Sequence, residues 1–170
     1  MTQRNPRAAA RPNMHAGMDT PASPPRSVPR DLASGWEHFD HGADIGVRGW
    51  GPTKAAAFEQ AALAMTAVLT DPERVEPREE VEIRCEAGDD ESLLVAWLNA
   101  IVTEMALRRM LFSSFRVELQ GRRLEGRASG EPVVPQRHQP AVEVKGATYT
   151  ELRVRPGATG GWVAQTIVDV

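Results

Sequence analysis

The stretch that decides the fold, residues 36–51, is WEHFDHGADIGVRGWG. Its second half alternates apolar residues with others, a pattern that predicts a strand. The last ten residues, 161–170, are GWVAQTIVDV and predict another strand, with one acid almost at the C-terminus. If the two strands pair, the carboxylates of Asp44 and Asp169 and the terminal carboxylate of Val170 can meet as an all-oxygen cation site.

The chain has 170 residues, enough for one domain with a sizeable core. Its formal net charge is −3, but residues 1–34 hold five Arg and two Asp, so this segment carries +3 and the remainder −6. An acidic body disfavours direct binding to a nucleic-acid backbone and favours a basic protein partner.

The single cysteine, Cys85, excludes an internal disulfide and a multi-thiolate zinc site. It lies in an alternating segment, where we expect a buried and inert thiol. No stretch approaches the ~20 apolar residues of a membrane span, and the N-terminus lacks the apolar centre of a secretory signal. We therefore expect a soluble, cytoplasmic protein.

Residues 1–34 form a basic segment rich in Pro, Ala and Arg, with six of the thirteen prolines and almost no large apolar side chains. Such a segment cannot bury enough apolar area to offset the entropy of ordering. We predict a disordered tail, followed by one domain at residues 35–170. A tail that touches RNA or a protein partner is an alternative, and so is a start codon placed too early.

Two amphipathic helices are expected in the domain. Residues 54–69 carry apolar side chains at three- and four-residue intervals after Thr53, a good N-cap, and Pro72 follows their end. A second helix begins with acids at residues 89–91, which suit the positive end of the helix dipole. Its apolar stripe includes Trp97, which we therefore expect in the core.

Strand patterns fill the rest of the domain. The expected strands are residues 75–86, 115–119, 123–128, 142–154 and 162–170. The second and third flank Gln120-Gly121 and form a hairpin, and the last two pair with each other. A proline-rich surface loop is expected at residues 131–140. These elements predict an α+β fold, a two-layer sandwich of a mainly antiparallel or mixed β-sheet with two helices packed on one face.

Several standard catalytic motifs are missing from the sequence: a Walker loop, a dinucleotide-type glycine fingerprint, a paired-cysteine metal motif and a nucleophile elbow. His38 and His41 are three residues apart, but we expect them in a turn before a strand, where zinc-protease spacing does not apply. His38 is expected to be a surface or capping residue. His41 stays open between a structural and a functional role, because it lies three residues before Asp44.

Asp44 and Asp169 each have an ordinary structural explanation, since Asp often closes a turn and an acid at a strand end can simply face solvent. Together with the C-terminal carboxylate they supply hard oxygen donors, which suit Ca²⁺ or Mg²⁺ better than zinc. Lys145 lies on the expected neighbouring strand, either as a solvated edge charge or as a charge offered to a carboxylate or phosphate.

Four motifs, in order over about residues 36–170, resemble those of the archease family. They are HGADIGV at 41–47, WLN at 97–99, KGATY at 145–149 and IVDV at 167–170. Each motif alone is weak, but four in register are specific. The family pattern usually has Thr where this chain has Gly42 and His where it has Thr150, so a hydroxyl and an imidazole are absent here. Residues 1–34 have no counterpart in the family.

The resemblance implies a helper without catalysis of its own, which activates an RtcB-type RNA ligase in tRNA splicing or RNA repair. In that family the helper promotes the ligase–guanylate intermediate and restores multiple turnover, while GTP and Mn²⁺ are bound by the ligase. The family's metal site maps to Asp44, Asp169 and Val170, with Ca²⁺ as the expected ion and Mg²⁺ as the alternative. The predicted partner-binding residues are His41, Lys145 and Tyr149.

Other functions stay open beside this one. The family was also proposed to act as a chaperone of a tRNA methyltransferase. Rivals from other classes are a small metal-dependent hydrolase that uses His41 and Asp44, and a plain RNA-binding module. For the helper itself we expect neither stable direct binding to nucleic acid nor contact with a membrane.

Overall fold

The computed structural model describes residues 33–170. The predicted tail, residues 1–34, therefore lies outside the described residues except for its last two. The helices and strands are β1 (Gly35–His41), β2 (Asp44–Gly51), α1 (Lys54–Leu69), the 3₁₀ helix η1 (Pro72–Arg74), β3 (Glu79–Glu86), α2 (Asp90–Arg108), β4 (Met110–Gln120), β5 (Arg123–Pro132), α3 (Pro135–His138), β6 (Gly146–Ala147), β7 (Arg153–Pro156) and β8 (Trp162–Asp169).

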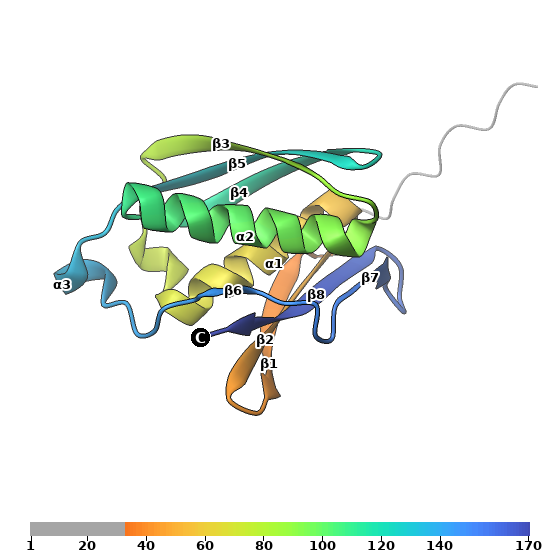
Figure 1. Cartoon of the computed structure of the whole chain (residues 1–170), viewed down its shortest axis with the longest axis horizontal. Coiled ribbons are helices and arrows are strands. Elements are labelled where there is room, and N and C mark those ends of the chain that lie inside the picture. Colours follow the sequence, from red (N-terminus) through yellow and green to blue (C-terminus); the bar gives the residue numbers. More distant parts are fainter. Residues whose placement is uncertain (1–32) are drawn as a thin grey trace, which may run out of the picture.

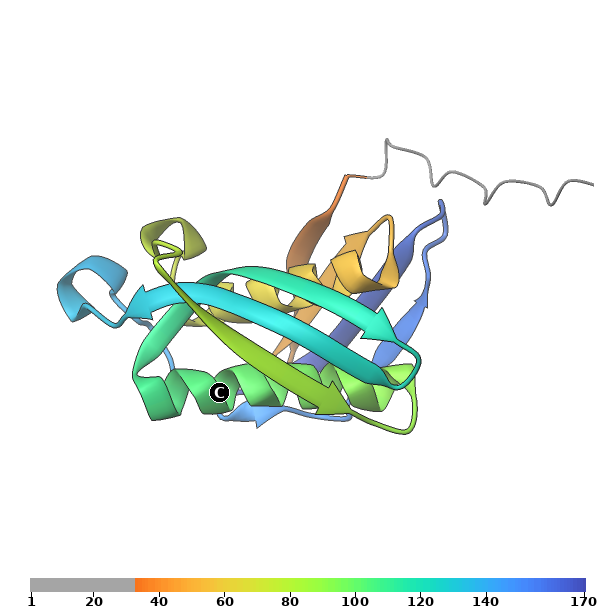
Figure 2. The same cartoon turned by 90° about the horizontal axis from the view of Figure 1, so that it is seen from above.

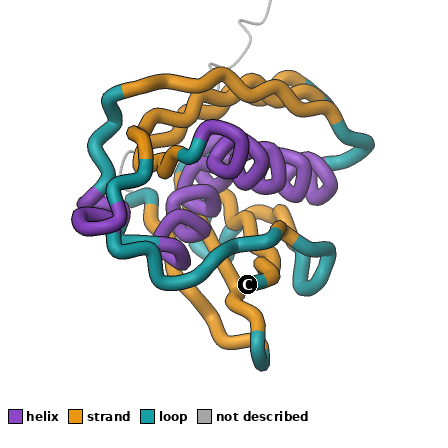
Figure 3. The backbone as a smooth tube through the Cα atoms, turned by 60° about the vertical axis from the view of Figure 1, so that its left-hand side comes forward, coloured by secondary structure: helices purple, strands orange, loops and turns teal. Residues whose placement is uncertain are grey.

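The strands form two antiparallel sheets with the two long helices between them (Figure 1, Figure 3). Sheet A has the order β1-β2-β8-β6, with β7 also paired to β8, and sheet B has the order β3-β5-β4. Helix α1 packs on β2 and β8 of sheet A and on β4 of sheet B. The predicted α+β class is confirmed. The division of the strands between two sheets is a feature that the local patterns do not reveal.

The second helix connects the two layers. Helix α2 packs on β3, β4 and β5 of sheet B and on β6 and β7 of sheet A. Seen from above, sheet B spreads over α2, whereas the long strands of sheet A run at an angle to it (Figure 2). The C-terminus lies near β6 and below α2 (Figure 1).

Trp97 of α2 lies at the centre of the core and is fully buried, as its place on the apolar stripe predicts. Its indole N–H donates to the carbonyl oxygen of Phe58 on α1 at 3.3 Å. Its ring meets the Phe115 ring of β4 edge to face, with 6.1 Å between the ring centroids. One side chain thus joins both helices and sheet B.

Helix α1 begins and ends at the predicted residues, and the Thr53 hydroxyl accepts a hydrogen bond from the Ala56 N–H at 3.0 Å. Strand β2 lies close against this helix. A Cβ atom at Gly49 would be only 2.2 Å from the backbone nitrogen of Ala61, so this position requires glycine. The close contact fixes β2, and with it the end of the strand that carries Asp44.

Several strand predictions differ from the structure. Strand β4 begins at Met110 instead of Phe115, and β5 continues to Pro132 instead of Ala128. We expect a turn around His38, whereas this residue lies in β1, which becomes a strand by pairing with β2. The strand expected from residue 75 begins only at Glu79, because η1 and a short connection precede it. The strand expected at residues 142–154 is reduced to β6 and β7, since side chains hold most of the segment between them.

The sequence also predicts an inert thiol at Cys85 and no membrane-spanning segment. Cys85 is partly buried on β3, and this burial raises the pKa of its thiol, which agrees with the expected inert cysteine. Within residues 33–170 no helix combines the length and the apolar character needed to cross a membrane.

Candidate functional site

The β1–β2 hairpin presents His41 and Asp44 at one end of sheet A. The two residues pair across the two-residue turn of Gly42 and Ala43. Gly42 has a φ of +62°, in the left-handed region that glycine adopts without a steric penalty. The β-branched Thr that the family pattern usually has would be strained in this turn. Gly42 therefore suits this turn, although it lacks the hydroxyl of the Thr in the family pattern.

The register of β2 and β8 puts the two predicted acids at the same end of sheet A. Ile45 pairs with Val168 at the end of this ladder. The next position outward in the same register puts Asp44 opposite Asp169. Directly opposite residues of an antiparallel pair have Cβ atoms about 4.5–5.5 Å apart. Asp44 is half-buried and Asp169 is exposed, so both can reach water.

Strand β6 holds the C-terminus on the other side of β8. Gly146 pairs with Asp169, and the backbone N–H of Lys145 donates to the Asp169 carbonyl oxygen at 2.8 Å. The Lys145 ammonium donates to a backbone oxygen of Val170 at 3.3 Å. We name Asp44, Asp169 and Val170 the C-terminal site. Lys145 already offers one positive charge to this site.

Asn99 of α2 fixes β6 in place, a role that sequence reasoning missed. Its side-chain amide donates to the Ala147 carbonyl oxygen at 3.3 Å, and its Oδ1 accepts from the Ala147 N–H at 2.8 Å. The side chain therefore makes the two bonds that a neighbouring strand would make. The signals in the sequence are the family-like motif WLN at 97–99 and the place of this polar residue directly after the apolar pair Trp97-Leu98.

Tyr149 lies between β6 and β7 and is 69% exposed. The backbone around it is fixed by β8. The Thr148 hydroxyl donates to the Ile167 carbonyl oxygen at 3.0 Å, and the Ile167 N–H donates to the Thr150 carbonyl oxygen at 3.2 Å. An exposed phenol on a fixed backbone is well suited to contact another molecule.

The two histidines of the hairpin differ in their surroundings. Nε2 of His38 lies 2.7 Å from the Ala64 carbonyl oxygen, a hydrogen bond that joins β1 to α1. His41 is exposed beside Asp44. In the described part of the chain no three side chains of His, Cys, Asp and Glu converge on one point. The predicted cation ligands include only two such side chains, with the chain terminus as the third group.

A second polar cluster lies where we expect a surface loop, at the end of β5. Glu131 and His138 are only 2% and 1% exposed. The Glu131 carboxylate accepts from the Glu76 N–H and from the His138 imidazole, each at 2.9 Å, and pairs with Arg137 at 2.7 Å. Nδ1 of His138 accepts from the Val134 N–H at 2.8 Å, so Nε2 carries the proton that the carboxylate accepts. We name these groups the buried cluster.

Hydrogen bonding dominates the electrostatics of the buried cluster. The bond from the Glu76 N–H lowers the pKa of Glu131, with further contributions from His138 and Arg137, although burial acts in the opposite direction. Throughout residues 33–170 every buried polar side-chain atom has a hydrogen-bond partner. The cluster is enclosed and fully bonded, which fits a structural role.

The family model described as the archease protein family (MTH1598/TM1083) matches residues 36–170. The archease of Thermococcus gammatolerans is 39% identical over 139 residues, which cover 79% of this chain and 98% of that protein. The archease of Methanopyrus kandleri is 42% identical over 139 residues, which cover 79% of this chain and 99% of that protein.

The fold has a relative of known structure. The solution structure of protein 1598 from Methanobacterium thermoautotrophicum is similar with a TM-score of 0.70 and 34% identity, over 80% of this chain and 99% of that one. The match to the family model and the identity to relatives over almost their whole lengths show that this chain belongs to the archease family.

Proposed function

We propose that this chain is a helper protein that activates an RtcB-type RNA ligase, and that a divalent cation at the C-terminal site takes part in the activation. The observation that carries the proposal is the strand register: Ile45 pairs with Val168 and Gly146 pairs with Asp169, so Asp44, Asp169 and the chain terminus belong to the same end of sheet A. Membership of the archease family supports the choice of partner.

Ca²⁺ fits the donors of the C-terminal site better than other common ions. It takes six to eight oxygen ligands at about 2.3–2.6 Å in a flexible geometry, whereas Mg²⁺ requires a near-ideal octahedron. Two carboxylates and a terminal carboxylate supply part of such a shell, and the exposure of Asp169 leaves room for water or for a group of the partner.

The ligase supplies the chemistry in this proposal, with GTP and Mn²⁺ bound there. An active site that holds nucleotide phosphates and RNA ends needs a basic entrance, to which an acidic partner is electrostatically complementary. The charge of −6 on residues 35–170 agrees with such a docking partner. His41, Lys145 and Tyr149 are exposed, the first beside Asp44 and the second beside Val170, and they form the proposed contact.

The main rival is a small metal-dependent hydrolase that uses His41 and Asp44, because these residues face each other across the hairpin. The purified chain can be assayed on phosphodiesters with Mn²⁺ or Mg²⁺. The helper is expected to show no turnover. Metal-dependent turnover that Asp44→Ala abolishes would reject the helper in favour of the hydrolase.

Reconstitution with the cognate ligase under multiple turnover tests the proposal directly. The wild-type chain is expected to accelerate ligase guanylylation and ligation. Asp44→Ala should fail to do so while keeping its far-UV circular dichroism, and Asp40→Ala, an exposed acid on β1, serves as the matched control. No acceleration by the wild type rejects the function. Normal activation by Asp44→Ala rejects the cation site alone.

A further inference from the structure

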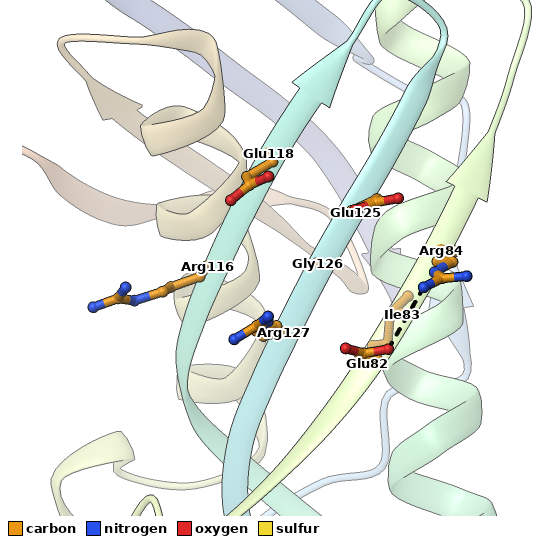
Figure 4. A pocket seen from close by; sticks show the side chains of 8 residues that line it. All are labelled: Glu82, Ile83, Arg84, Arg116, Glu118, Glu125, Gly126 and Arg127. Carbon is orange, nitrogen blue, oxygen red and sulfur yellow. Dashed lines mark ion pairs between the residues drawn. The ribbon is translucent and has the colours of Figure 1, made fainter.

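The outer face of sheet B, turned away from α2, carries two rows of charged side chains that run across its three strands (Figure 4). The rows follow from the strand register and line a shallow hollow of about 150 Å³. In the order β3, β5, β4, the first row is Glu82, Arg127, Arg116 and the second row is Arg84, Glu125, Glu118. All six side chains are exposed, and on every strand the charge changes sign between the rows.

Part of this arrangement is unfavourable within a single chain. Between β3 and β5 the rows set opposite charges against each other, Glu82 against Arg127 and Arg84 against Glu125, but between β4 and β5 they set like charges together. Arg116 lies opposite Arg127, and Glu118 lies opposite Glu125. Like charges at directly opposite positions destabilise an antiparallel pair. Within residues 33–170, Arg116, Glu118 and Glu125 form no ion pair, in contrast to most of their charged neighbours. The two like-charged pairs therefore favour a partner that carries the same charges in the opposite order.

We propose that this face is an interface between two copies of the chain. The copies stack face to face about a two-fold axis that lies between the rows and perpendicular to the strands, so that each strand lies over its own counterpart. The operation exchanges the rows. Arg116 then faces Glu118 of the second copy, Arg127 faces Glu125, and Glu82 faces Arg84, each pair occurring twice.

The geometry allows these pairs to form. Stacked sheets lie about 10 Å apart, a distance that an arginine and a glutamate side chain span together. The next rows outward bring Glu80 opposite Glu86 of the second copy. Each of these acids already has an arginine of its own chain, Arg127 at 3.4 Å and Arg123 at 3.6 Å. Because Arg127 also faces Glu125 of the second copy, this outer contact competes with a central pair and limits the affinity.

The charge pattern favours a second copy over other occupants. Three arginines and three glutamates leave the two rows with no net charge, whereas a nucleic-acid backbone is attracted to a face of uniform positive charge. An acidic or a basic protein would meet as many repulsive as attractive groups. A second copy is the partner that always presents the inverted order.

The area of the outer face of sheet B determines how tightly the two copies are expected to bind each other. The strands have 8, 11 and 10 residues. At about 3.3 Å per residue and about 4.8 Å between strands, the face covers roughly 400 Å². This is about half of the ~800 Å² per partner that stable interfaces bury. We therefore expect a weak dimer in rapid exchange, which salt dissociates because its contacts are exposed ion pairs.

Analytical ultracentrifugation of the full chain at low ionic strength tests the interface. The apparent mass of the wild type should double as concentration rises and return to that of the monomer on addition of salt. In Arg116→Glu the new glutamate of each copy faces Glu118 of the other copy, so association should be lost. The matched control is Arg155→Glu, the same charge change at an exposed position of sheet A, which should associate as the wild type does.

Mixing two variants tests the two-fold register itself. Arg116→Glu and Glu118→Arg should each fail to self-associate, because like charges meet across the axis. In an equimolar mixture the acids of one variant face the arginines of the other at both positions, so mass doubling should return. A wild type that stays monomeric, a single variant that dimerises like the wild type, or a mixture that remains monomeric overturns the proposal.

Discussion

The C-terminal site and the buried cluster use the same residue types in opposite ways. In the buried cluster, Glu131 is almost fully buried and bound by a backbone N–H, an imidazole and a guanidinium group. In the C-terminal site, Asp169 is exposed, and the bonding that we see there comes from Lys145. The two carboxylates differ in their burial and in the number of groups that hydrogen-bond to them.

This contrast indicates which acids are available for binding. A buried carboxylate whose oxygens already accept from protein donors has little capacity left for a ligand. Two neighbouring acids at the end of a sheet repel each other, and a cation relieves that repulsion. The first arrangement therefore stabilises the fold, whereas the second is the one that we propose as a metal site. A substitution in one of these two regions should therefore leave the other intact.

Removal of the buried imidazole should have the largest effect. His138→Ala leaves the Val134 N–H without its acceptor, takes one donor from Glu131 and creates a cavity. Unsatisfied buried groups cost about 1–3 kcal/mol and a cavity adds to this, so the free energy of unfolding in urea should fall by roughly 3 kcal/mol. Ca²⁺ binding should not change.

The matched control for this variant is His38→Ala, which loses one partly buried bond to the Ala64 carbonyl oxygen. A single such bond contributes about 1 kcal/mol. If the two variants lose the same stability, the buried cluster is not the structural centre that its geometry indicates.

The pH dependence of stability should also report on the buried cluster. The bond from the Glu76 N–H lowers the pKa of Glu131 in the folded chain. Folding is therefore favoured above the ordinary glutamate pKa, and this contribution is lost as the pH falls through the lowered folded-state value. Urea midpoints measured against pH should fall less steeply in acid for Glu131→Gln than for the wild type. Equal slopes would show that another group controls acid unfolding.

The helices could be predicted from sequence because their signals are local. The hydroxyl of Thr53 and the spacing of apolar residues define α1 without reference to any other element. Strand β1 could not be predicted in this way, because its many polar residues form a strand only when β2 offers a partner. The segment at residues 142–154 has a strand pattern, but Asn99 and Thr166 hold parts of it with side-chain bonds instead of a full ladder.

The C-terminal site and the buried cluster also differ in how far they could be predicted from local sequence signals. The position of Asp44 and Asp169 at the same end of sheet A could be predicted, since the pairing of two recognisable strands is enough to bring their ends together. The burial of Glu131 and His138 could not, because a proline-rich polar stretch carries no local sign of burial. It arises when α3 folds back and the Glu76 N–H reaches the end of β5.

A change at the C-terminal site should affect binding and leave stability almost intact. Asp169→Ala removes one of the proposed ligands, and its Ca²⁺ affinity should fall by about tenfold or more, since even groups that only support a metal ligand contribute about 10–100-fold. The free energy of unfolding should change by no more than about 0.5 kcal/mol, because the side chain is exposed. Calorimetric titration with Ca²⁺ measures the affinity. An unchanged affinity, with Asp40→Ala as reference, would reject the site.

The smallest expected effect concerns the charge that Lys145 brings to the same site. Its ammonium lies 3.3 Å from a backbone oxygen of Val170, where it competes with a cation for the terminal carboxylate. At a separation of about 8 Å in water, a single charge repels a divalent ion by about 1 kcal/mol, and salt reduces this further. Lys145→Gln should therefore raise the Ca²⁺ affinity by about two- to fivefold, whereas Lys145→Arg, which keeps the charge, should leave it unchanged. A lower affinity in Lys145→Gln would mean that the lysine orients the chain terminus for the ion and does not compete with it.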